Sequence, residues 1–474
     1  MMKKIVKFSP LVLALVLVGC GTLGPNYQRP ATELPTNAIK PQSTHLAANV
    51  DWLVWWKSFQ DSALNALLDE AAANSADLAF AVARIEESRA SLALTHASRF
   101  PTVDATVNAS HSQVSENAGK LQPGANPRYN DFQPGLTAAF EIDFWGKFQR
   151  ADEAARARLL SLEASRGSVL ATLYANVAQN YFALRSFDAQ VALAEQTFST
   201  RKENLRLQVL RFQGGVIGDL DVEQATAEAA SIEATLLQAQ QNRRATEAAL
   251  AVLLGRSPAA IIQPNIARGT AIDALFTRAT VPAELPSDLL NRRPDVIAAE
   301  QQLIAANSDI GQAKAAYYPT IKLTASVGYE SRQLSDLFNP ASLFWNLASG
   351  LTQPLFRAGS IDAVVAGANA RKAQATAQYA QAVQGAFKDV HDALNNIAAN
   401  EALVTTADKR IKALREVLRL ANLRYTNGYS SYLEVLNAQR DLSQAESSVI
   451  DAKRAQLSGV VALYKAVGGG WAAP

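Results

Sequence analysis

The sequence predicts an α+β membrane protein whose chain supplies four transmembrane β-strands and very long α-helices, arranged in two internal repeats. The first observation is the repeat, in which positions 213 residues apart match without a gap from Arg158/Arg371 to Gly255/Gly468. The second is a pair of long helical stretches without proline. The third is a set of short segments that alternate between apolar and polar residues. The repeat comes first because it decides the architecture.

The first 19 residues predict a signal peptide, in which three lysines precede an apolar run too short to span a bilayer as a helix. The run ends in Leu-Val-Gly-Cys at 17–20, which resembles a bacterial lipobox and predicts lipid attachment at Cys20. Since Cys20 is the only cysteine, disulfides and thiolate metal sites are excluded elsewhere. The residue after Cys20 is Gly21, which resembles the signal that sorts lipoproteins to the outer membrane. Outer-membrane lipid is therefore an expected partner.

Composition gives no indication of nucleic-acid binding. The net charge of +2 falls to −1 once the three leader lysines are removed, so no basic surplus remains. The chain is 49% hydrophobic but only 7% aromatic, because alanine supplies much of the apolar share. Small side chains of this kind let helices approach closely, as they do in bundles and coiled coils.

Residues 20–60 predict an irregular, lipid-tethered N-terminal segment. Prolines interrupt it, beginning with Gly-Pro-Asn-Tyr-Gln-Arg-Pro at 24–30. An aromatic cluster lies within it, formed by Trp52, Trp55, Trp56 and Phe59. The cluster either anchors the chain at a membrane interface or packs against the folded body, and packing is favoured.

Short helices and alternating strands follow, and the second half of the chain repeats them. Helices are expected over about 61–73, 76–98 and 294–316, the last with Pro294 at its first position. The four predicted strands lie at about 102–111, 134–144, 320–329 and 345–355, joined in pairs by loops at 111–133 and 330–343. The first three strands place apolar residues on one face and polar residues on the other, whereas the fourth alternates less cleanly.

The strands are compatible with a small soluble sheet or with a membrane sheet. Each has about the 9–11 residues that a tilted transmembrane strand needs, and the lipobox favours the membrane. Four strands cannot close a membrane barrel, since the smallest have about eight. A membrane sheet therefore requires an oligomer, with eight strands from two chains or twelve from three.

A long helix follows each pair of strands, over about 148–213 and 361–427, and each would be roughly 100 Å long. Gly215 and Gly428 lie in the turns after these helices, where glycine can adopt the left-handed conformation that ends a helix. Taken alone, each unit is compatible with any antiparallel coiled coil. The expected division is a signal peptide (1–19), the tethered segment (20–60), repeat 1 (61–255, tip turn 214–218), a proline-broken mid-rod connection (256–291), repeat 2 (292–470, tip turn 427–431) and a tail (471–474).

Several motifs together resemble one known family. They are Leu-Val-Gly-Cys at 17–20, the run at 24–30, Arg-Pro-Asp at 293–295, Phe-Arg-Ala-Gly at 356–359, Leu-Arg-Tyr-Thr-Asn-Gly at 423–428, the stretch 432–440, and the stretch 463–471. The chain resembles the TolC-like outer membrane factors of tripartite efflux pumps, in the lipoprotein branch that includes OprM and NodT-type proteins. The resemblance implies a homotrimer with a 12-stranded β-barrel continued by a 12-helix periplasmic α-barrel. It also implies two partners, a periplasmic adaptor (membrane fusion protein) and an inner-membrane RND-type pump, and no cofactor.

The resemblance further implies roles at the helical tips. Adaptor-contacting residues would be Gly214, Gly215, Val216, Ile217, Asn427, Gly428 and Tyr429. The periplasmic gate would be formed by Asp221, Glu434, Tyr425 and Asn437, where Asn437 stands in place of a second acid of some relatives. Ser430 stands where TolC has a gating arginine, so the salt-bridge form of the gate is not expected here.

The gate acids have an equally weighted second interpretation. Ser431 and Glu434 fit a helix capping box, and Asp219 and Asp221 fall in a first turn, where acids complement the helix dipole. One residue can serve both as a cap and in a pore ring. If Glu434 faces a three-fold pore, repulsion would raise its pKa and the ring would attract cations.

The sequence therefore predicts an exit duct and not an enzyme. His45, His96, His111 and His391 share no ligand spacing, and no nucleophile motif or phosphate loop is present. The expected function is an outer-membrane exit duct that passes small molecules from pump and adaptor to the exterior. An exit duct for type I protein secretion has the same fold, and a lipid-anchored periplasmic coiled-coil scaffold is the alternative of another class.

Overall fold

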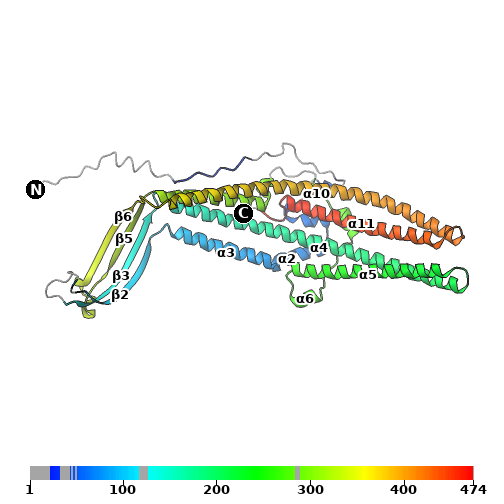
Figure 1. Cartoon of the computed structure of the whole chain (residues 1–474), viewed down its shortest axis with the longest axis horizontal. Coiled ribbons are helices and arrows are strands. Elements are labelled where there is room, and N and C mark those ends of the chain that lie inside the picture. Colours follow the sequence, from blue (N-terminus) through cyan, green and yellow to red (C-terminus); the bar gives the residue numbers. More distant parts are fainter. Residues whose placement is uncertain are drawn as a thin grey trace. The chain divides into compact units, whose positions relative to one another are not determined.

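The computed structural model describes residues 22–31, 43, 46–47, 51–115, 117, 126–282 and 289–472 (Figure 1). The predicted signal peptide, Cys20 and His45 lie outside the described residues. The chain divides into two compact units. Unit 1 comprises Met1–Ala31, Ile85–Leu162 and Ala299–Tyr379, and unit 2 comprises Thr32–Arg84, Glu163–Ala298 and Ala380–Pro474.

Unit 1 holds an antiparallel sheet of four strands in the order β2-β3-β5-β6 (Figure 1). The strands are β2 (Thr102–Gln113), β3 (Arg128–Ile142), β5 (Thr320–Tyr329) and β6 (Leu343–Thr352). The third strand has the predicted bounds and the fourth lies slightly earlier than predicted. The loop predicted at 111–133 is wrong at both ends, because β2 continues to Gln113 and β3 already begins at Arg128, which pairs with Gln113. Its first residues are polar, so the cross-strand pairing extends the hairpin without an apolar signal.

The register of the sheet confirms the two faces. One row joins Val103, Ala138, Ala325 and Leu347 across all four strands, and the next apolar row joins Ala105, Leu136, Val327 and Trp345. The row between them is polar and joins Asp104, Thr137, Ser326 and Asn346. Successive residues of a strand point to opposite faces, so one face of the sheet is apolar and the other polar. The fourth strand alternates less cleanly because Ser349 lies in an apolar row, opposite Leu323.

The N-terminal segment of unit 1 is tied to two helices. Arg150 of α4 (Lys147–Gln213) donates to the Leu23 carbonyl at 3.0 Å and to Asn26 Oδ1 at 2.9 Å. Arg29 donates two hydrogen bonds to the Glu300 carboxylate of α9 (Pro294–Lys314), at 2.7 and 2.6 Å. The run at 24–30 is therefore a structural strap, and the expected irregular conformation is confirmed for its described residues.

Unit 2 contains the largest hydrophobic core, which surrounds the aromatic cluster. Trp55 and Phe59 belong to η1 (Trp52–Phe59) and are 2% and 0% exposed. The Trp55 ring stacks on Tyr464 of α11 (Tyr432–Ala466), with centroids 5.3 Å apart. The favoured interpretation, packing against the folded body, is confirmed for this cluster.

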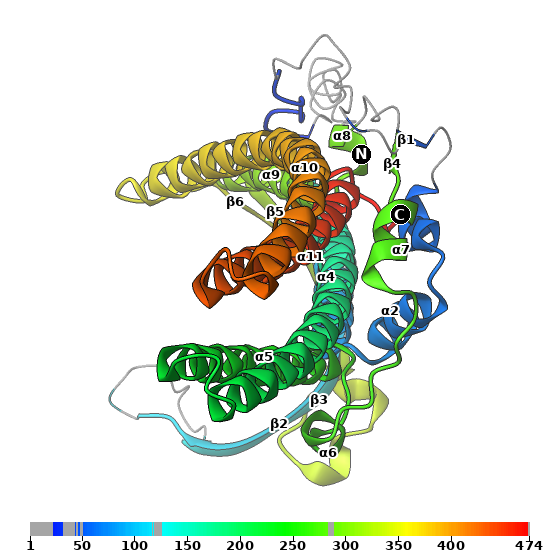
Figure 2. The same ribbon diagram turned by 90° about the vertical axis from the view of Figure 1, so that its right-hand side faces the viewer.

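The predicted helices α2 (Ser62–Asn74) and α3 (Ala76–Ala97) are confirmed. Both long helices are continuous, α4 over Lys147–Gln213 and α10 over Ser360–Thr426. Within unit 2, α4 lies beside α5 (Asp219–Leu253), and α10 lies beside α11 (Figure 2). The hairpin repeat is therefore present as predicted, with one α4–α5 hairpin and one α10–α11 hairpin.

The connection between the repeats is more ordered than its prolines indicate. It contains α6 (Pro258–Ile262), α7 (Ile272–Arg278), β4 (Val281–Pro282) and α8 (Leu289–Arg292). β4 pairs in parallel with β1 (Leu46–Ala47) of the tethered segment. Pro258 starts a helix at its first position, where a missing amide proton has no consequence.

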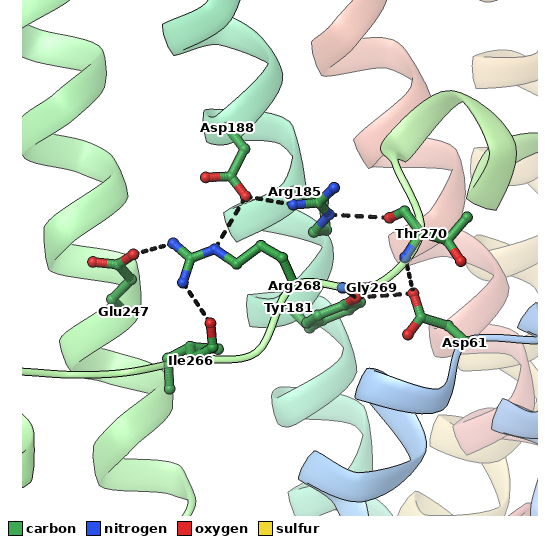
Figure 3. Close-up of polar contacts among 9 residues, drawn as sticks. All are labelled: Asp61, Tyr181, Arg185, Asp188, Glu247, Ile266, Arg268, Gly269 and Thr270. Carbon is green, nitrogen blue, oxygen red and sulfur yellow. Dashed lines mark hydrogen bonds and ion pairs between the residues drawn. The ribbon is translucent and has the colours of Figure 1, made fainter.

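A buried carboxylate fixes this connection to the helices of unit 2 (Figure 3). Asp61 is 1% exposed and accepts hydrogen bonds from the Tyr181 hydroxyl at 2.9 Å and the Thr270 amide at 2.8 Å. It also caps α2 by accepting from the amides of Ala63 and Leu64. Alongside, Arg268 forms ion pairs with Asp188 and Glu247 (Figure 3). Burial and the Asp61 hydrogen bond raise the pKa of Tyr181, so its hydroxyl remains a donor.

Candidate functional site

The two hairpin turns share one backbone motif. In each, the glycine amide donates to the carbonyl three residues back, and the next amide donates to the carbonyl five residues back, at 2.9–3.0 Å. This is the Schellman motif, which requires a left-handed residue at the glycine. Gly215 and Gly428 accordingly have φ angles of +71° and +77°. The same bonds recur at Gly255 and Gly468, so the internal repeat extends to the backbone hydrogen bonds.

The tips are open surfaces. An added Cβ at Gly215 or Gly428 would meet no atom within 4 Å, so conformation alone and not space requires glycine there. Val216 and Tyr429, the residues that follow, are 75% and 78% exposed. Of the predicted tip residues, Ile217 is half-buried, and those exposed are Gly214, Gly215, Val216, Asn427, Gly428 and Tyr429.

Tyr425 joins the α10–α11 hairpin to the α4–α5 hairpin. Its hydroxyl donates to Gln208 Oε1 at 3.0 Å, and the Arg211 guanidinium lies over its ring, 5.4 Å from the centroid. Its ring also packs against Tyr432 with centroids 5.4 Å apart. Gln208 is only 4% exposed, so this hydrogen bond is shielded from water.

A second link was not predicted from the sequence. Glu228 of α5 is 2% exposed and lies 3.5 Å from Arg201 of α4 and 2.6 Å from Arg440 of α11. One carboxylate thus joins both hairpins. Burial lowers the pKa of the Arg201 guanidinium, and the Glu228 charge opposes this effect. The internal repeat contained a signal for this link. The repeat equivalent of Arg440 is Ala227, so the two copies of the repeat differ at the position where the hairpins meet.

The remaining gate residues lie near the turns but do not form one cluster. The predicted capping box is not formed by Ser431, whose side chain makes no capping hydrogen bond. Glu434 instead lies 3.5 Å from Arg424. Asp221 is half-buried in the first turn of α5, and Asn437 is exposed. A role of these residues in a pore ring remains a prediction.

The described residues contain no group of three or more His, Cys, Asp or Glu side chains that could hold a metal ion. Across these same ranges, no helix has the length and apolar character needed to cross a membrane. His96 and His111 are instead paired with single neighbours, Asp152 and Asn130.

A two-faced antiparallel sheet in a chain with repeated helical hairpins and open glycine tips defines a membrane channel protein with a helical extension. The profile of the Outer membrane efflux protein family matches residues 67–256 and 285–469. The cation efflux system protein CusC of Escherichia coli is 33% identical over 467 residues, with 98% of this chain and 99% of CusC covered. The solvent efflux pump outer membrane protein SrpC of Pseudomonas putida is 33% identical over 473 residues, with 98% of each chain covered.

A solved structure gives the same result. The outer membrane channel CmeC of Campylobacter jejuni superimposes with a TM-score of 0.88 at 25% identity, covering 96% of each chain. The chain belongs to the outer membrane efflux protein family. It is an outer membrane factor of tripartite efflux and forms the exit duct in the outer membrane, so the predicted fold class, location and general function are confirmed.

Proposed function

We propose that the chain acts as a homotrimer which docks onto a periplasmic adaptor through its glycine tips. The duct would pass small molecules delivered by an inner-membrane RND-type pump, as a passive conduit without catalysis. The observation that carries this proposal is the pair of matching, open Schellman turns, which present Val216 and Tyr429 to solvent at the ends of both hairpins. An apolar side chain exposed at one open tip and an aromatic side chain exposed at the other suit a protein partner.

The sheet supports assembly from several copies. β2 and β6 are its two edges, and each edge strand leaves a row of backbone groups that needs a partner. Apolar side chains such as Val107, Trp345 and Leu347 are 80%, 74% and 73% exposed in the single chain. A closed barrel of several copies would pair the edges and turn the apolar face toward lipid.

The N-terminal strap supports a lipid anchor at Cys20. The Leu23 amide donates to the Trp145 carbonyl at 3.2 Å, and an added Cβ at Gly146 would lie 2.7 Å from the Thr22 side chain. Thr22 is therefore held just beyond the end of β3, two residues after Cys20. Two residues span about 7 Å, so an acyl chain on Cys20 would enter the membrane beside the sheet.

We further propose that the packing of the two hairpins is the closed gate. Tyr425 and Arg440 hold the α10–α11 hairpin against Gln208 and Glu228 of the other hairpin, so this gate includes an ion pair although Ser430 made a salt bridge unexpected. Opening would separate the hairpins, which requires both links to break. Glu434, with its ion pair to Arg424, would face the entrance and favour cations.

The cargo is expected to be selected elsewhere in the pump. CusC and SrpC are equally identical to this chain, yet one is named for cation efflux and the other for solvent efflux. Both methionines of the chain, Met1 and Met2, lie in the predicted leader, so the mature chain offers no thioether to a soft metal ion. A permissive duct accommodates either cargo class.

Docking is tested by placing a photo-cross-linking phenylalanine analogue at Tyr429 in cells that contain the whole pump. We expect a covalent product with the adaptor. The control position is Gln238, which lines a cleft of about 510 Å³ between α4, α5 and α11, roughly 30 Å along α5 from the turn. Products at Gln238 and none at Tyr429 would show docking along the side of the helices and refute tip docking.

A further inference from the structure

The internal repeat relates the two β-hairpins of unit 1 by fixed offsets. β2 matches β5 at an offset of 218 and β3 matches β6 at an offset of 213. The offsets turn the pair Thr102↔Ala139 into Thr320↔Thr352 and the pair Ser110↔Asp131 into Gly328↔Phe344. All four pairs are present in the sheet. The structure therefore obeys the repeat to the single residue within each hairpin.

We propose that the same two offsets also determine how the edge strands of neighbouring copies pair. The contact between the two repeats is β3–β5, with Ala138 opposite Ala325. Adding 213 to Ala138 of β3 gives Leu351 of β6, and subtracting 218 from Ala325 of β5 gives Val107 of β2. The pair therefore becomes Leu351 of one copy opposite Val107 of the neighbouring copy. The edges β6 and β2 would pair antiparallel in this register, with Ala348 opposite Ser110 and Thr352 opposite Thr106. The inference rests on the proposed assembly of identical copies and adds its register.

The chemistry of the strands supports this register independently. Leu351 and Val107 are 67% and 80% exposed in the single chain, and both lie on the apolar face of the sheet. The proposed register places them side by side toward lipid, while Thr352 and Thr106 meet on the polar face. A slip of one residue would bring Leu351 opposite polar Asn108 or Thr106 and turn one strand inside out.

The helices of unit 1 extend the inference beyond the sheet. Arg158 of α4 forms an ion pair with Asp309 of α9, and Ala305 lines the same cleft of about 260 Å³. Adding 213 gives Arg371 of α10 as the repeat equivalent of Arg158, and subtracting 218 gives Glu87 of α3 as the repeat equivalent of Ala305. Glu87 and Arg371 are both exposed in the single chain. The two offsets therefore place Glu87 of one copy beside Arg371 of its neighbour.

Cysteine pairs test the register directly, because the only natural cysteine is the predicted lipid site. Phe132 and Ser331 exchange both backbone hydrogen bonds, at 3.0 and 3.1 Å, so the pair Gly135↔Gly328 is of the non-hydrogen-bonded type. Ala348 opposite Ser110 is its repeat equivalent, with an expected Cα separation of about 4.5 Å. That separation permits a disulfide.

The design uses four substitutions in two matched and two mismatched combinations. The matched pairs are S110C with A348C and T106C with T352C. The mismatched pairs, S110C with T352C and T106C with A348C, carry the same changes about 13 Å out of register. After mild oxidation of outer membranes, we expect covalent oligomers on non-reducing gels from both matched pairs and from neither mismatched pair. The largest covalent species gives the number of copies.

The outcomes separate the register from the assembly. Cross-linking by a mismatched pair, or its absence from both matched pairs in oligomers that still resist detergent, would overturn the register while the assembly stands. A wild-type protein that remains monomeric in the membrane would instead refute the proposed assembly. As a second measure, E87R and R371E should each lower the temperature at which the oligomer dissociates, and the charge-reversed double variant should restore it. Additive losses in the double variant would contradict the helix contact.

Discussion

Replacing Tyr425 with phenylalanine tests the proposed gate at a single oxygen atom. The change keeps the ring against Tyr432 and beneath Arg211 but removes the 3.0 Å hydrogen bond to Gln208. Gln208 is 4% exposed, so its amide oxygen loses a shielded partner, which costs about 1–3 kcal/mol. If only the closed packing contains this bond, the equilibrium between closed and open gates shifts about 5- to 150-fold toward open.

The assay is single-channel conductance of the purified oligomer in planar bilayers. We expect Y425F and Q208A each to raise the open fraction, and the double variant to resemble either single variant because both remove the same bond. Phe212, the repeat equivalent of Tyr425, is 44% exposed and is the control, so F212L should leave the open fraction unchanged. Additive effects of Y425F and Q208A, or an unchanged open fraction in both, would refute a gate held closed by this hydrogen bond.

Three further predictions concern stability and selectivity. G269A should lower the free energy of unfolding by about 1–3 kcal/mol in thermal unfolding, since its Cβ would lie 2.2 Å from Asp61 Oδ1; an unchanged midpoint would contradict the close packing. Hydrogen bonding to Arg256 lowers the pKa of Glu70, so the pair stabilises the fold above the usual glutamate range and this stability is lost as the pH falls through the lowered pKa. The destabilisation by E70Q, about 0.5–1 kcal/mol because the pair is partly exposed, should therefore be present at pH 7 and shrink as the pH falls below the usual glutamate range. E434Q should reduce cation selectivity in planar bilayers, and unchanged selectivity would show that Glu434 does not belong to the pore ring.

The long elements were predictable because their signals are local and repeated. The absence of proline and the glycine turns place α4 and α10 within about one residue of the structure. The apolar alternation likewise gives the two faces of the sheet. The start of β3 was missed because Arg128 and its neighbours are held by pairing with β2 and not by an apolar pattern.

The parts that depend on distant contacts could not be predicted from one sequence. Asp61 and Thr270 are separated by 209 positions, and only folding brings the two residues within hydrogen-bond distance. Glu228 and Arg440 each resemble an ordinary charge on a solvated helix face, yet they form an ion pair between the hairpins in which the Glu228 carboxylate is buried. Sequence likewise favoured a cap between Ser431 and Glu434 as strongly as a pore ring, whereas Glu434 pairs with Arg424.

The most direct test of the account is the accumulation of drugs and dyes in cells that lack this gene. The same cells are then supplied with wild type, Gly428→Ala or Gly428→Trp. Both substitutions impose the strain of a left-handed residue, about 1–2 kcal/mol, but only tryptophan fills the open tip. We expect deletion to raise accumulation, wild type and Gly428→Ala to restore export, and Gly428→Trp to reach the outer membrane without restoring it. Unchanged accumulation after deletion, combined with the loss of a secreted protein, would contradict small-molecule efflux through a tip-docked duct.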